Sequence, residues 1–66
     1  MLTLHPTAKQ TGTGFRPMII VRNARGQCIG SRTCRAAPIS FKFYAETIAM
    51  IAAARVARRF PNLRAA

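Results

Sequence analysis

The segment of residues 15–34 constrains the fold most strongly, because it has the pattern of two short strands joined by a tight turn. Asn23 is suited to open a type I turn, and Gly26 is suited to the left-handed position that closes such a turn with a bulge. The residues on either side are rich in the β-branched types that favour strands. The sequence therefore predicts a β-hairpin.

The register of this hairpin predicts one apolar face and one basic face. A turn opened by Asn23 places Ile19 opposite Ser31 and Met18 opposite Arg32 if the pairing is continuous. Because side chains alternate across a strand, the residues of each strand divide between two faces. We expect one face to hold Phe15, Ile19, Val21 and Ile29, and the other to hold Arg16, Arg22 and Arg32 beside Met18, Ile20 and Cys28.

A long helix is predicted for residues 40–60. This run has strong helix formers and no glycine, Ser40 is a suitable N-cap, and Pro61 follows its end. At about 100° per residue, its apolar stripe consists of Phe41, Tyr44, Ala45, Ile48, Ile51, Ala52 and Val56. Because a lone hairpin is only marginally stable in water, we expect this stripe to cover the apolar face of the hairpin.

The predicted fold class is a small single α+β domain in which the hairpin packs against one C-terminal helix. Residues 1–14 contain Pro6, Gly12 and Gly14 and show no sustained period, so we expect a flexible N-terminal arm. Leu2 and Leu4 alternate as in a short strand, but the arm is the favoured interpretation. The predicted organisation is an arm at 1–14, a ββα domain at 15–62 and a frayed tail at 63–66.

The charge balance predicts a polyanionic partner. Eleven lysines and arginines face a single acid, Glu46, which gives a formal charge of +10. Phosphates would relieve the mutual repulsion of these charges and release counterions, and the arginine fork suits phosphate. We expect a nucleic acid, DNA or RNA, as partner. The candidate contacts are the arginines of the hairpin, the segment after it and the helix end, namely Arg16, Arg22, Arg25, Arg32, Arg35, Arg55, Arg58 and Arg59.

Two alternatives use the same surface. The first is a small inhibitor or regulator, of the phage or mobile-element type, that docks on an acidic surface of a protein or nucleoprotein machine; composition does not separate it from nucleic-acid binding. The second concerns Met18 and Ile20, which lie among the arginines and suit a buried contact between two copies. A chain of 66 residues buries a modest core, so we expect a homodimer through helix faces or strand edges.

The remaining residues give little basis for catalysis, metal binding or membrane insertion. The chain has one carboxylate, a single histidine, His5, and two cysteines, so we expect neither an enzyme nor a cofactor. Cys28 and Cys34 have five residues between them, whereas structural zinc sites have about two to four, so no metal site is expected. The apolar run at 47–54 is too short to span a bilayer, and we expect a soluble cytoplasmic protein.

Overall fold

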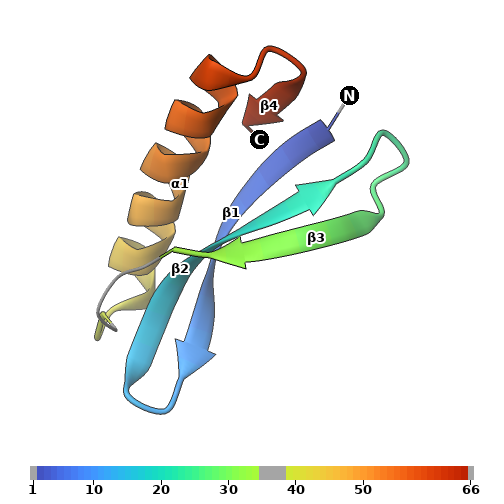
Figure 1. Cartoon of the computed structure of the whole chain (residues 1–66). Coiled ribbons are helices and arrows are strands. Elements are labelled where there is room, and N and C mark those ends of the chain that lie inside the picture. Colours follow the sequence, from blue (N-terminus) through green and yellow to red (C-terminus); the bar gives the residue numbers. More distant parts are fainter. Residues whose placement is uncertain (1, 35–38, 66) are drawn as a thin grey trace.

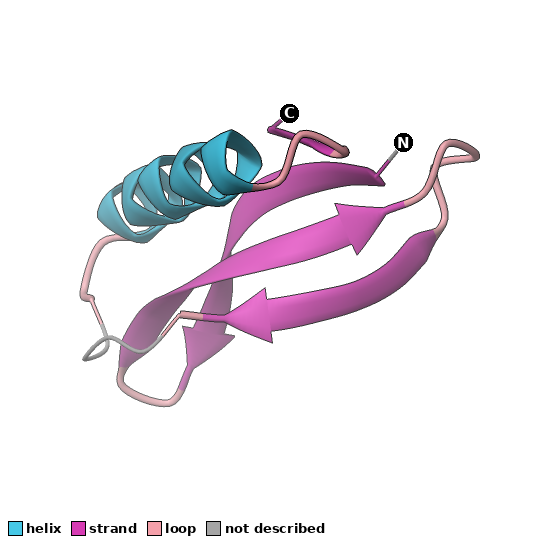
Figure 2. Ribbon diagram, turned by 45° about the horizontal axis from the view of Figure 1, so that its top comes forward, coloured by secondary structure: helices cyan, strands magenta, loops and turns pink. Residues whose placement is uncertain are grey.

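The computed structural model describes residues 2–34 and 39–65, which form a four-stranded sheet with one helix against one of its faces (Figures 1 and 2). The elements in chain order are β1 (Leu2–Thr11), β2 (Gly14–Arg22), β3 (Cys28–Thr33), α1 (Lys42–Arg59) and β4 (Leu63–Ala65). The strand order is β3-β2-β1-β4, with β2 antiparallel to β1 and β3, and β4 parallel to β1. The α+β class and the packing of the hairpin against a C-terminal helix are confirmed.

The N-terminal segment differs from the prediction, because β1 is an interior strand of the sheet. It pairs with β2 from Thr3 opposite Arg22 to Thr11 opposite Gly14. Leu4 is only 3% exposed and belongs to the core. The expectation of a flexible arm is therefore wrong for Leu2–Thr11. Apolar residues alternate here with threonines and His5, as a strand with one buried face requires, and the pairing with β2 outweighs the weak local propensity.

The C-terminal segment also differs, because Leu63–Ala65, expected to fray, forms β4. The backbone N–H of Phe60 donates to the Val56 carbonyl (3.1 Å), and that of Leu63 donates to the Phe60 carbonyl (3.0 Å). This turn brings the chain back to the sheet, where β4 pairs with Leu2–Leu4. The tail is ordered because it has a sheet edge to join, and Leu63 packs against the core.

The turn of the hairpin is confirmed. The Asn23 carbonyl accepts a hydrogen bond from the Gly26 N–H (2.9 Å), and Gly26 has φ of 81°. The Asn23 side-chain Oδ1 accepts from the backbone N–H groups of Arg25 (2.9 Å) and Gln27 (3.0 Å). Asn23 therefore fixes the turn through both its backbone and its side chain, as its residue type predicts.

The register of β3 departs from the prediction beyond the first pair. Arg22 lies opposite Cys28 as expected, but Val21 then lies opposite Gly30, so Ile29 is an extra residue in a bulge. A shift of one residue turns the following side chains to the other face. Arg32 consequently pairs with Ile19 on the helix-covered side. The prediction that it shares a face with Arg16 and Arg22 is wrong.

The helix packs on the sheet through alanines. Ala45, Ala49 and Ala53, spaced four residues apart, are each 0% exposed, and they lie over the part of the core that includes Leu4 and Ile19. The predicted stripe is therefore only partly correct. Ala45, Ala52 and Val56 face the sheet, whereas the bulky members Phe41, Tyr44, Ile48 and Ile51 are exposed. The small alanines allow close approach of the helix to the strands, and the bulky residues are left on its outer surface.

The start of the helix is set by the segment before it. The N–H and carbonyl of Ile39 each pair with Phe15 at 2.8 Å, so Ile39 is still bridged to β2. The helix consequently begins at Lys42 with Phe41 at the N-cap and no side-chain cap, and the predicted Ser40 cap is wrong. This bridge also explains Gly14, where a Cβ would lie 2.7 Å from the Ile39 carbonyl oxygen.

Candidate nucleic-acid interface

The helix covers one face of the sheet, and the other face has no second layer in the part of the chain that the structure describes (Figure 2). Directly paired residues project to the same face, so the register identifies the side chains on this open face. They are Thr3, His5, Thr7, Lys9 and Thr11 of β1, Arg16, Met18, Ile20 and Arg22 of β2, Cys28, Ser31 and Thr33 of β3, and Arg64 of β4.

Cations lie at both ends of the open face. At one end Lys9 is directly opposite Arg16, and at the other Thr3 lies between Arg22 and Arg64. Directly opposed residues have Cβ atoms about 4.5–5.5 Å apart, and like charges at this distance destabilise the sheet. Glu46 is the only acid of the chain, and it lies on the helix, 3.9 Å from Lys42. The positive charge of the open face is therefore not balanced by any Asp or Glu side chain among the described residues.

The middle of the open face is uncharged. One row places Ile20 between His5 and Ser31, and the next places Met18 between Thr7 and Thr33. Ile20 and Met18 are half-buried by their neighbours, and the flanking side chains include three with hydroxyl groups. No Phe, Tyr or Trp lies on this face among the described residues. The face consequently offers hydrogen-bond donors and a small apolar surface but no aromatic platform for base stacking.

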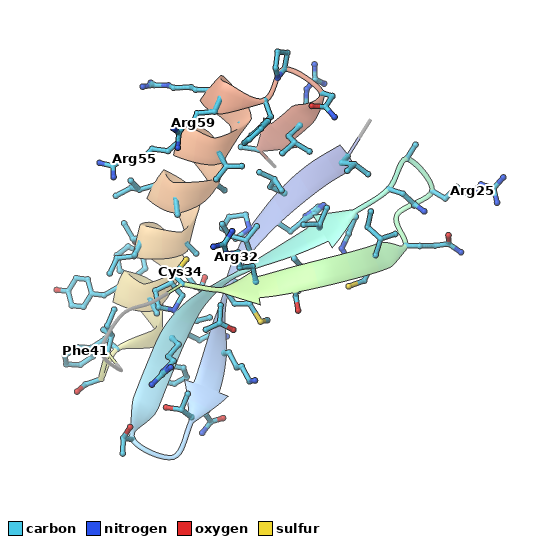
Figure 3. The ribbon with its side chains drawn as sticks, viewed as in Figure 1. Arg25, Arg32, Cys34, Phe41, Arg55 and Arg59 are labelled. Atoms are coloured by element: carbon cyan, nitrogen blue, oxygen red, sulfur yellow. The ribbon has the colours of Figure 1, made fainter. Side chains whose placement is uncertain are left out.

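The two charged ends have a spacing that suits a polymer. Arg16 and Arg22 are six residues apart on β2. At the usual rise of a strand they lie about 20 Å from each other. One strand of B-DNA rises through about six phosphates over that distance. Arg25 lies beyond Arg22 at the tip of the hairpin (Figure 3), and the Arg22 Nη1 donates to the Gly26 carbonyl at 2.9 Å.

The fold separates the arginines that the sequence groups together. Arg16 and Arg22 lie on the open face and Arg25 at the hairpin tip, whereas Arg32, Arg55, Arg58 and Arg59 lie on the helix side of the sheet. Figure 3 shows Arg55 and Arg59 on α1, away from the hairpin tip. Arg35 lies outside the described residues. Of the predicted contact residues that the structure describes, Arg16 and Arg22 therefore share the open face, one at each end.

Sequence reasoning missed two cations of the open face, Lys9 and Arg64. Both lie in segments interpreted as an arm and a tail, and both are placed by the pairing of β1. His5, assigned to the same arm, lies opposite Ile20 in the centre of the face. The pattern that identifies Lys9 and His5 is the alternation of polar and apolar residues from Leu2 onwards.

The described residues contain no group of three His, Cys, Asp or Glu side chains placed to hold a metal ion. Cys28 is an exposed free thiol, and Cys34 is a half-buried one. Within the ranges 2–34 and 39–65, no helix has both the length and the apolar character needed to cross a bilayer.

The chain matches no protein-family model, no curated protein and no solved structure. The geometry and charge of the open face are therefore the features that point to a function.

Proposed function

We propose that the protein binds nucleic acid through the open face and contacts its phosphates. The observation that carries the proposal is the uncompensated charge at both ends of this face, where Lys9 is opposed to Arg16 and Arg22 lies across Thr3 from Arg64. At each end of the face, the two positive charges repel each other in the free protein. A row of phosphates converts that repulsion into attraction and releases counterions.

The chemistry of the open face favours contact with the backbone of the polymer. Threonine and serine hydroxyls next to arginines donate to phosphate and sugar oxygens, which position a protein without reading sequence. Bases would require aromatic side chains for stacking, and this face has Met18 and Ile20 at its centre instead. We therefore propose modest sequence preference and action by binding without catalysis. We also propose a location in the cytoplasm.

A salt titration tests the proposal. Fluorescence anisotropy is measured with labelled duplex DNA, single-stranded DNA and duplex RNA at about 50 and 200 mM salt. Four phosphate contacts give a slope of about −3.6 in log affinity against log salt for a duplex, so affinity falls about a hundredfold over this range. If the protein binds none of the three probes at the lower salt, the proposal is contradicted. A slope weaker than about −1 also contradicts it.

A further inference from the structure

A groove opens on the other side of the sheet, between the helix and β3. Its volume is about 440 Å³, and it is lined by Ile19, Arg32, Thr33, Cys34, Ala52 and Val56. It exists because α1 packs over β1, β2 and β4 and leaves β3 uncovered on the helix side of the sheet. We call this the α1/β3 groove. Figure 3 shows Arg32 and Cys34 on the β3 side of it.

The helix wall of the groove continues into an exposed apolar stripe. Residues three or four apart are neighbours on a helix, so Ile48 lies next to the groove residue Ala52, and Tyr44 lies next to Ile48. Tyr44 is 58% exposed, Ile48 40% and Ile51 51%, and the Tyr44 ring packs edge-on against Phe41 at 5.7 Å. Bulky apolar side chains gathered in this way on a small domain mark an interaction surface.

The charges around the groove decide which partner fits. Arg32 lies on its β3 wall, and Arg55, which does not line the groove itself, follows the lining residue Ala52 by three positions and is its neighbour on the helix. The one acid of the chain, Glu46, is 3.9 Å from Lys42 and is not among the groove residues. A second copy of the chain would bring a further charge of +10 and one more acid. Charge complementarity therefore favours a partner that supplies carboxylates.

We propose that the α1/β3 groove binds an acidic amphipathic helix of a partner protein. The apolar side of that helix covers Ile48 and Ile51, as in other complexes where a helix lies in a groove, and its carboxylates pair with Arg32 and Arg55. The groove lies on the opposite side of the sheet from the open face. Both surfaces are therefore accessible at the same time, and the protein would link the partner to a nucleic acid.

The test uses synthetic peptides as long as α1, which has 18 residues. One peptide carries Leu at heptad a and d positions with Glu on both flanks, the second scrambles that composition, and the third replaces every Glu with Lys. Binding to the full chain is measured by fluorescence anisotropy. We expect the first peptide to bind at least about tenfold more tightly than the scrambled one, and the Lys peptide not to bind.

Neighbouring helix residues provide matched variants. Ile51 and Met50 are 51% and 57% exposed, so serine at either position leaves the core intact. Ile51→Ser is expected to weaken binding of the acidic amphipathic peptide about tenfold, whereas Met50→Ser leaves it unchanged. Two double variants remove the same charge. Arg32→Gln with Arg55→Gln is expected to weaken peptide binding. The control, Arg16→Gln with Arg22→Gln on the open face, is expected to leave it unchanged.

Four outcomes would overturn this inference. Absence of binding, or equal binding of the scrambled peptide, shows that the groove does not recognise an amphipathic helix. Self-association that is abolished by Ile51→Ser in sedimentation equilibrium makes a second copy the occupant, as the predicted homodimer would require. Displacement of the peptide by single-stranded DNA that depends on Arg32 and Arg55 makes the groove a nucleic-acid site.

Discussion

Replacing Leu4 with alanine is expected to lower the free energy of unfolding by about 2–5 kcal/mol, because it leaves a cavity beneath the helix. Leu4 is 3% exposed, and the core cluster places it with Ile19 and Ala53. A domain of this size has a total stability of roughly 3–5 kcal/mol, so the variant should be largely unfolded at room temperature. Urea denaturation followed by circular dichroism measures the loss.

The matched control for Leu4→Ala is Ile29→Ala. Ile29 is also a bulky aliphatic residue of the hairpin sheet, but it lies in the bulge of β3 and is 54% exposed. Its truncation should cost less than about 1 kcal/mol. If both variants were equally stable, residues 2–11 would not be the interior strand that the structure shows, and the open face would lose Lys9 and His5.

Removing Arg16 and Arg22 together should produce the largest change in nucleic-acid binding. Arg16→Ala with Arg22→Ala removes one cation from each end of the open face. Each lost phosphate contact lowers the salt slope by about 0.9, so the slope should fall from about −3.6 to about −1.8. At about 50 mM salt we expect affinity to fall by roughly ten- to a hundredfold. Anisotropy titrations at several salt concentrations give both quantities.

The control for this variant has the same net charge. Arg55→Ala with Arg59→Ala also removes two positive charges, but both side chains are exposed on α1 on the other side of the sheet. It should change affinity by less than about threefold, because only the long-range attraction is weakened. A loss as large as that of the open-face variant would mean that binding depends on total charge and not on this surface. Circular dichroism verifies that both variants are folded.

The parts of the fold that the sequence predicts well are local. Asn23 and Gly26 specify the turn through bonds that span only five residues, from Asn23 to Gln27. The helix is specified by an uninterrupted run of good helix formers that ends before Pro61, and its observed end at Arg59 agrees with the prediction. Each of these features needs no information from distant parts of the chain.

The parts that sequence reasoning missed depend on contacts between distant segments. β1 and β4 have weak local propensity and form because each joins an edge that the other strands provide. The bulge at Ile29 is one residue of extra length, with no sequence feature that sets it apart, yet it moves Arg32 to the helix side. The helix face could not be assigned because its alanines and its bulky residues are both apolar, and close approach to the sheet selects the alanines.

These misses changed the candidate site more than the fold class. Arg16 and Arg22 remain on the same face because both lie on β2 and are an even number of positions apart, and every second side chain of a strand points to the same side. The partners that complete the open face, Lys9 and Arg64, come from segments interpreted as a flexible arm and a frayed tail. A surface assembled from several strands requires the register of every strand, and periodicity within one segment does not provide it.

Methyl groups on the two sides of the sheet allow the most direct test of the central claim, which is that nucleic acid binds the open face. Met18 and Ile20 report on that face, and Ile48 and Ile51 report on the exposed side of the helix. In a titration of methyl-labelled protein with single-stranded and duplex probes, the account predicts that the Met18 and Ile20 methyl resonances shift while those of Ile48 and Ile51 do not. Shifts confined to Ile48 and Ile51 would contradict it.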